Sequence, residues 1–147
     1  MGMVHAEITL TNSLDNGLAG KGYIKTEDIR TVTVTAVADT GSMHLVITEE
    51  LRQKLGLGVK EEKTAHVANG QQVKCHITEG VEVQWKDRTT IVPALVIPGA
   101  KKVLFGAIPM EAMDLMVNPV TQEVIGAHGD KEEFYALSYC LEPVPKL

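Results

Sequence analysis

The sequence predicts an all-β fold, a barrel or a sandwich, with one or two short helices. Many segments of about four to eight residues are rich in Val, Ile and Thr or alternate between apolar and polar side chains, as strands do. Turn signals such as Asn-Gly separate them. The chain has 147 residues, which is enough to bury a core. We expect one domain over residues 1–147, with a flexible tail at residues 141–147.

The first half of the chain holds three expected strands and one expected helix. Alternation predicts a strand over VHAEITL, residues 4–10, and Asn16-Gly17 indicates the turn after it. Residues 31–38, TVTVTAVA, and residues 43–47, MHLVI, are typical of strands. A helix of about two turns follows. Thr48 is its expected cap, two glutamates favour its first turn, and Gly56 suits its end.

The second half predicts hairpins and one further helix. KTAHVA, residues 63–68, and QQVKCHI flank Asn69-Gly70, the pair preferred where both central residues of a two-residue turn take positive φ. A second hairpin is expected around residues 86–88, and Pro93 and Pro98 bracket a short strand, ALVI. Residues 101–119 predict a strand, a glycine break, a short helix with Pro109 at its first position, and a last strand pair around residues 118–119.

Composition and charge exclude several classes of partner. The net charge is −5 and the Lys and Arg residues are scattered, so nucleic acid is not an expected partner. No apolar run approaches the roughly 20 residues that span a bilayer, and the start of the chain lacks the features of a signal peptide. The two cysteines make no disulfide framework. We therefore expect a cytoplasmic protein without a membrane partner.

Metals and other cofactors are not expected either. The five histidines are dispersed, and Cys75-His76 has no second ligand pair at the spacing of a zinc site. The Met-rich stretch AIPMEAMDLMV is more typical of core filling than of a binding surface. Charged runs such as Glu61-Glu62-Lys63 indicate a solvated face.

Three motifs stand in an order that carries chemistry. Asp39-Thr40-Gly41-Ser42 directly follows an apolar strand, the Asn69-Gly70 hairpin comes some thirty residues later, and Leu104-Phe105-Gly106 precedes a short helix. Taken alone, Asp39 and Gly41 also suit an ordinary turn. Together and in this order, the motifs resemble the retropepsin-like aspartic proteases, the single-lobe relatives of pepsin. The resemblance covers about residues 28–127 and implies their acid-protease barrel.

The chemistry explains why such a site needs an aspartate. Peptide hydrolysis without a metal or a covalent nucleophile requires an activated water, which two close carboxylates can supply when one is ionised and the other protonated. Two such groups share one proton and titrate as a unit. The chain holds one Asp-Thr-Gly motif, so the second Asp39 must come from another copy. The resemblance therefore implies a homodimeric aspartic endopeptidase acting on peptides or proteins.

The resemblance also implies a role for each motif residue. Asp39 is the catalytic carboxylate, Thr40 bonds across to the partner loop, Gly41 lets the backbone fold tightly and Ser42 supports the carboxylate. The hairpin tip at Ala68, Asn69 and Gly70 resembles the flap that closes over a bound peptide. Leu104, Phe105 and Gly106 resemble the motif that packs against the aspartate loop and shapes the pocket. Phe105 replaces the usual aliphatic residue and is expected to alter that pocket.

Two other interpretations remain open from the sequence. One is a catalytically silent domain of the same fold that binds peptides or serves in assembly. The other is an unrelated small β-barrel in which Asp39 lies in a turn and Asn69-Gly70 is a structural hairpin. The terminal segments VHAEITL and FYALSYCL are expected strands that could pair across a dimer interface.

Overall fold

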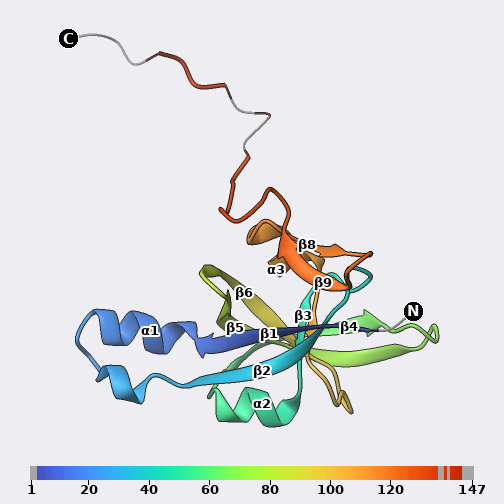
Figure 1. The fold of residues 1–147 in the computed structure, drawn as a ribbon. Coiled ribbons are helices and arrows are strands. Elements are labelled where there is room, and N and C mark those ends of the chain that lie inside the picture. The colour runs from blue at the N-terminus through green and yellow to red at the C-terminus, as the bar shows by residue number, and fades with distance from the viewer. Residues whose placement is uncertain (1–2, 136–137, 139, 144–147) are drawn as a thin grey trace.

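The structure is a computed structural model that describes residues 3–135, 138 and 140–143. These residues form nine strands, three α-helices and one 3-10 helix (Figure 1). The elements in chain order are β1 Val4–Asn12, α1 Ser13–Gly20, η1 Thr26–Asp28, β2 Thr31–Ala38, β3 Leu45–Ile47, α2 Glu49–Lys54, β4 Val59–His66, β5 Gln72–Trp85, β6 Arg88–Val96, β7 Leu104–Phe105, α3 Ala107–Ala112, β8 Leu115–Asn118 and β9 Glu123–Gly126.

Seven strands form one sheet that closes on itself. Their order is β1-β2-β7-β3-β6-β5-β4, and an additional pairing between β1 and β5 joins the two sides. Because β5 is long, its first half pairs with β4 and its second half with β1, while β6 follows it on the other edge. The ring therefore runs through six strands and β4 is attached outside it. This arrangement confirms the predicted all-β barrel.

The core fills the inside of this ring. Along much of β1, β5 and β6 its apolar side chains alternate with more exposed ones, as a sheet with one buried face requires, whereas all three residues of β3 and the last three of β2 are buried. The largest fully buried side chains include Leu10, Ile47, Val83, Phe105 and Met113. Met110 and Met113 are buried, which confirms the predicted core role for these two methionines, whereas Met116 is exposed.

A short parallel pairing with β7 fixes the position of the last residues of β2. Leu104 and Phe105 of β7 pair in parallel with Val37 and Ala38 of β2, and β7 pairs antiparallel with β3 on its other edge. The chain emerges from β2 at Asp39, whose N–H donates to the carbonyl of Phe105 (3.0 Å). Asp39 is thus held at the mouth of the barrel by backbone hydrogen bonds rather than on a free turn.

The predicted turn at Asn16-Gly17 is wrong, because both residues lie inside helix α1. The side chain of Asn12 caps this helix by accepting from the N–H of Asp15 (3.1 Å). The carboxylate of Asp15 in turn accepts from the backbone N–H, Nε and Nη2 of Arg30 at 2.9–3.0 Å. These bonds from Arg30, which lies outside the segment, stabilise the helix although Asn16 and Gly17 have a weak helix propensity. In Figure 1, α1 projects from one side of the barrel.

Helix α2 begins and ends as predicted. The hydroxyl of Thr48 accepts from the N–H of Leu51 (3.1 Å), and Gly56 takes a positive φ of 62° just after the helix. Helix α3 begins at Ala107, so Pro109 is its third residue. The prediction that Pro109 is the first residue of this helix is wrong. The close packing of Gly106 against the carbonyls of Ser42 and His44 fixes the start of this helix.

The strands predicted around residues 72–96 are longer than expected. QVKCHI and VEVQW belong to one strand, β5, and TTIV and ALV belong to one strand, β6, which continues through Pro93. Pro93 pairs with Gly80 at the point where the register of β5 shifts between Ile77 and Gly80. A proline without an N–H is tolerated at such an irregularity. The predicted hairpin at residues 86–88 is confirmed, with Lys86 at a φ of 51°.

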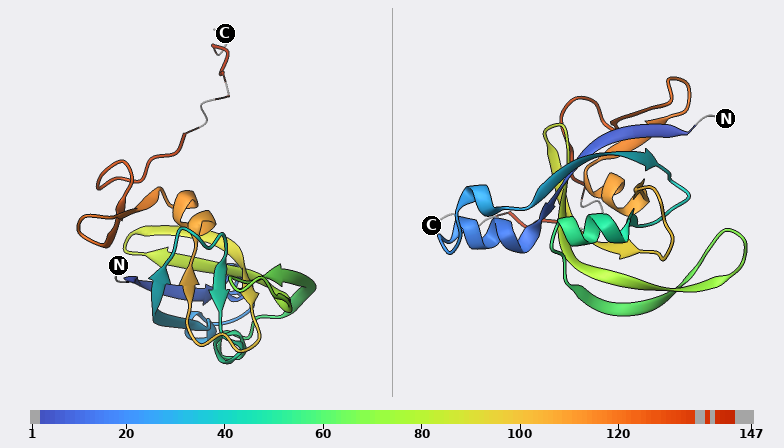
Figure 2. Two further views of the ribbon diagram at one scale, coloured as in Figure 1. Left: turned by 90° about the vertical axis from the view of Figure 1, so that its right-hand side faces the viewer. Right: turned by 90° about the horizontal axis from the view of Figure 1, so that it is seen from below.

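Strand β4 and the first half of β5 form an arm that projects beyond the barrel (Figure 2). Its tip is a three-residue loop, Ala68-Asn69-Gly70, because Val67 and Gln71 are still joined by a backbone hydrogen bond (3.0 Å). Gly70 alone takes a positive φ, of 82°, so the predicted two-residue turn at Asn69-Gly70 is wrong in type. The hairpin itself is confirmed, and the Asn69 side chain accepts from the N–H of Gln71 (2.9 Å).

The C-terminal part lies at one end of the barrel in Figure 1, where α3 meets the hairpin of β8 and β9. This hairpin confirms the predicted strand pair around residues 118–119. Arg88 is buried and donates to the carbonyls of Met113, Asp114 and Gly129 at 2.7–3.1 Å, which ties the hairpin to β6. Of the predicted terminal strand FYALSYCL, the described residues form no strand and the others lie outside the described residues. VHAEITL pairs within its own chain as β1.

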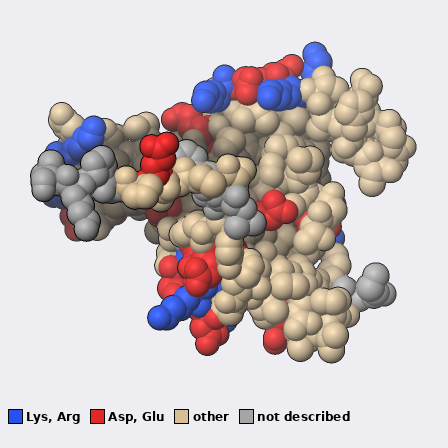
Figure 3. Space-filling view, turned by 90° about the horizontal axis from the view of Figure 1, so that it is seen from above, with Lys and Arg blue, Asp and Glu red and all other residues tan. Residues whose placement is uncertain are grey.

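The outer surface is mixed in charge. Among the described residues on the face shown in Figure 3, Lys and Arg side chains lie next to Asp and Glu side chains, between large uncharged areas. None of the helices in the described part of the chain is both long and apolar enough to cross a membrane.

Candidate active site

The loop after β2 presents Asp39 to solvent. Asp39, Thr40 and Gly41 are exposed, although Ala36, Val37 and Ala38 just before them are buried. The N–H of Gly41 donates to Oδ1 of Asp39 (2.9 Å), and the N–H of Ser42 donates to the Asp39 carbonyl (3.1 Å). A carboxylate that accepts a backbone N–H is held in one orientation. The loop thus holds a fixed, accessible carboxylate at the end of a rigid strand.

Gly106 locks this loop onto helix α3. The N–H groups of Ala107 and Ile108 donate to the carbonyls of Ser42 and Met43 at 2.8 and 2.9 Å. A Cβ atom at Gly106 would lie 2.6 Å from the carbonyl oxygen of Ser42 and closer still to that of His44. The φ of Gly106 is −88°, so close packing rather than an unusual backbone conformation excludes a side chain. The motif at residues 104–106 therefore packs against the aspartate loop.

Within the described part of the chain, neither Thr40 nor Ser42 forms a side-chain hydrogen bond across the site. The Ser42 hydroxyl donates to the carbonyl oxygen of His44 (3.5 Å) and does not donate to the Asp39 carboxylate. Its support of the carboxylate, and the bond of Thr40 to a second loop, therefore stay predictions. An added Cβ at Gly41 would lie 3.1 Å from Oδ1 of Asp39, so a side chain here would crowd the carboxylate that the Gly41 N–H contacts.

A groove of about 680 Å³ begins at this loop and runs under the arm. Its floor comes from the aspartate loop and the ends of β3, β6 and β7, and its roof comes from β4 and β5. The lining residues are mostly apolar: Asp39, Gly41, Ser42, Met43, His44, Val46, Lys63, Thr64, Ala65, His66, Val67, Ala68, Cys75, Ile77, Leu95, Ile97 and Leu104. Asp39 thus shares one groove with the hairpin that was expected to act as a flap.

Some of the predicted flap and pocket residues line the groove and others do not. Ala68 and Leu104 line the groove, whereas Asn69, Gly70, Phe105 and Gly106 do not. Phe105 is fully buried in the barrel core, so the expectation that it alters the pocket is wrong. Its larger ring fills space inside the barrel, and Leu104, which points the other way along the strand, meets the groove.

Cys75 is the nucleophile that could compete with Asp39 for a catalytic role. Its thiol lines the groove, is almost fully buried and lies 3.3 Å from the carbonyl of Lys63. Burial raises the pKa of this thiol, and the nearby Glu62 raises it further. The thiol is therefore protonated at neutral pH and is a poor nucleophile. It serves as part of the groove wall.

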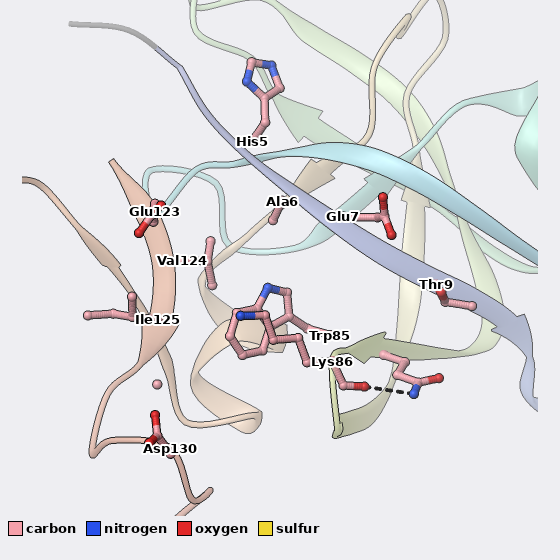
Figure 4. Close-up of a pocket in the computed structure, with 12 residues that line it drawn as sticks. His5, Ala6, Glu7, Thr9, Trp85, Lys86, Glu123, Val124, Ile125 and Asp130 are labelled. Carbon is pink, nitrogen blue, oxygen red and sulfur yellow. Dashed lines mark hydrogen bonds between the residues drawn. The ribbon is translucent and has the colours of Figure 1, made fainter. Parts of the chain in front are cut away.

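A second groove, of about 630 Å³, lies between β1, the end of β5 and β9 (Figure 4). Trp85 and Lys86 lie at its centre, with Lys86 Nζ 4.6 Å from the centre of the Trp85 ring. Glu7, Glu123 and Asp130 also line it. None of the predicted site residues lines this second groove, so Asp39 does not act there.

Within the described part of the chain, no group of three or more His, Cys, Asp or Glu side chains is arranged to hold a metal ion.

Several groove residues were not found from the sequence. Met43 and His44 stand directly after the motif, and their position beside Asp39 could have suggested them. Leu95 and Ile97 reach the groove because β6 pairs in parallel with β3, with Leu45 opposite Ala94. That pairing joins segments about fifty residues apart and leaves no local signal.

Comparison with known proteins agrees with this geometry. A family profile described as aspartyl protease matches residues 25–125. The chain is similar to the solved structure of EIAV protease complexed with the inhibitor HBY-793, with a TM-score of 0.50 and 16% identity, over 71% of this chain and 82% of that one. At this identity the likeness shows the fold alone. No curated protein sequence matches the chain. The family match spans more than half of the chain and includes the Asp39 loop and the Leu104–Gly106 motif. The chain belongs to the retropepsin-like aspartyl protease family.

Proposed function

We propose that the protein is an aspartic endopeptidase that works as a homodimer, with one Asp39 from each copy. The observation that carries the proposal is the Asp39 loop itself. It is held by backbone bonds to β7 and α3, opens onto the groove and presents its carboxylate to solvent. The described residues that line the groove supply no second carboxylate. A pair of carboxylates that shares one proton therefore needs a second copy.

The surroundings of Asp39 support a second copy on this face. Met43 is 63% exposed and Ile108, joined to it by a backbone bond, is also exposed. Apolar side chains beside an exposed polar loop are typical of a surface that another protein covers. A two-fold axis through this face would bring the two Asp39 loops together and place each Thr40 opposite its copy.

In this mechanism the shared proton decides the chemistry. The ionised Asp39 accepts a proton from the water that lies between the two carboxylates, and the protonated Asp39 donates to the carbonyl oxygen of the peptide bond. The apolar groove holds the side chains of the substrate, and the arm closes over it and limits access of bulk water. The water oxygen bonds to the carbonyl carbon and forms a tetrahedral diol. As the carbon–nitrogen bond breaks, the leaving amine takes the proton that the pair holds, and a hydroxyl of the diol returns one proton to the pair, which is then in its starting state.

The Asp39→Asn variant tests this proposal. Asn has nearly the same shape as Asp, so the loop and the dimer should form. The rate of peptide cleavage should fall by at least about 100-fold, because an amide cannot accept the proton from water. The measurement is cleavage of a diverse peptide library, followed by mass spectrometry over a range of pH for wild type and variant.

The same experiment distinguishes the protease from the second candidate function, a catalytically silent peptide-binding domain of the same fold. Equal cleavage by wild type and variant would assign the activity to another residue. If neither protein cleaves any peptide but both bind peptides, the binding domain is the better account. The exposed and oriented carboxylate favours the protease.

A further inference from the structure

We infer that the groove selects peptides that carry an acidic side chain a few residues from the cleaved bond, and that Lys63 is the residue that binds this side chain. This inference rests on the proposed function, because it describes the substrates of the same groove. It concerns the roof of the groove, formed by the arm of β4 and β5, and not the carboxylates.

The register of the arm places Lys63 on its inner face. Lys63 pairs with Cys75, and Thr64 pairs with Lys74. Paired residues of an antiparallel ladder point to the same face, and successive residues point to opposite faces. Cys75 is almost fully buried in the wall of the groove. Lys63 therefore projects on the groove side, and Lys74 projects on the outer side.

Lys63 is the one Lys or Arg among the described residues that line the groove. The other lining side chains that can carry positive charge are His44 and His66, and the one lining carboxylate is Asp39. Away from Asp39, the groove thus offers apolar contacts and a cation. A peptide with apolar residues and one acidic residue complements both, whereas a basic residue near Lys63 would be repelled.

The ion pair that Lys63 forms with Glu61 is weak. The Lys63 ammonium lies 3.6 Å from Oε1 of Glu61, and both side chains are at least half exposed. An ion pair of this kind contributes little, because water and salt screen it. Glu61 does not line the groove. A ligand carboxylate inside the groove, where less water is present, would interact with Lys63 more strongly than Glu61 does.

The position of Lys63 indicates where the acidic residue lies in the substrate. Lys63 precedes the tip residue Ala68 by five positions, a span of about 17 Å along a strand. If the tip covers the cleaved bond, the extended substrate places an acidic residue roughly two to four residues away, since a lysine side chain reaches partly back along the groove.

The test compares wild type with Lys63→Glu on peptides that differ at one position. Each peptide carries Glu, Gln or Lys at one of the four positions on either side of the cleaved bond, and kcat/KM is measured for each. At one or more of these positions wild type should prefer Glu over Lys by roughly three- to tenfold at low salt, and added salt should weaken the preference. Lys63→Glu should reverse it, and Lys63→Met should abolish it.

The matched control is Lys74→Glu, which makes the same charge change on the outer face of the same arm. This variant should keep the wild-type preference. An unchanged preference in Lys63→Glu, or the same change in both variants, would overturn the inference. The same peptides are also tested for binding to the Asp39→Asn variant by fluorescence anisotropy. A preference for acidic peptides in binding without cleavage by wild type would support Lys63 and contradict the protease, while absence of any preference in both assays would contradict Lys63.

Discussion

At the scale of single residues, the site depends on two positions with opposite demands. Asp39 is exposed and fixed by its neighbours, whereas Gly106 is enclosed between the aspartate loop and α3. The motif in the sequence identified both residues, but it could not show why Gly106 has no side chain. The reason is the close approach of the carbonyls of Ser42 and His44, which the fold brings from another segment.

Gly106→Ala should therefore destabilise the protein and reduce activity together. The added methyl group overlaps backbone atoms that cannot move without breaking the bonds of Ala107 and Ile108 to the loop. Overpacking of this kind costs about 1–3 kcal/mol. The free energy of unfolding is measured by urea denaturation and the activity by peptide cleavage.

The control for that variant is Gly17→Ala. Gly17 lies inside α1, and an added Cβ meets no atom within 4 Å. This variant should gain up to about 1 kcal/mol, because alanine favours a helix over glycine. If Gly106→Ala were as stable as wild type and fully active, the described contact between the aspartate loop and Gly106 would be wrong.

At the scale of elements, local signals identified those whose partners are close in sequence. The cap at Thr48 and the hairpins at residues 69–70 and 86–88 could be predicted because their determinants lie within a few residues. Helix α1 could not, since Asn16-Gly17 favours a turn and the helix depends on Arg30. The continuous strands β5 and β6 were missed because Gly80 and Pro93 look like ends until they are paired.

The ion pair that anchors α1 predicts a dependence of stability on pH. The hydrogen bonds from Arg30 hold the pKa of Asp15 below its ordinary value of 3.8, against the effect of burial. The unfolded chain then binds a proton more readily, so this stabilisation is complete above about pH 4 and is lost as the pH falls further. Asp15→Asn should lower the free energy of unfolding by about 1–2 kcal/mol at pH 7, which is near or below the lower end of the range for charged hydrogen bonds because Arg30 is half exposed.

Urea denaturation at pH 7 and near pH 3 checks this expectation, with Asp28→Asn as the control. Asp28 lies exposed in η1, and its loss of charge should change stability by less than about 0.5 kcal/mol. The difference between wild type and Asp15→Asn should shrink at the lower pH. A difference that is equal at both pH values would show that the carboxylate of Asp15 contributes no charge-dependent stability.

At the scale of the whole molecule, one chain supplies half of the proposed site. The barrel, the arm and the groove are complete within it, but the described lining of the groove holds no second carboxylate to share the proton of Asp39 as the proposed mechanism needs. The sequence predicted this incompleteness, because one Asp-Thr-Gly motif cannot make a pair. It could not predict the groove face of the arm, which depends on the register between β4 and β5.

The most direct test of a shared site is to mix wild type with Asp39→Asn at a constant total concentration, let the copies exchange, and measure the rate of peptide cleavage. If both Asp39 residues of a dimer are needed, the rate follows the square of the wild-type fraction, so an equal mixture retains about one quarter of the wild-type rate. A rate that stays proportional to the amount of wild type, about one half in the same mixture, would mean that each chain cleaves alone and would contradict the shared pair of carboxylates.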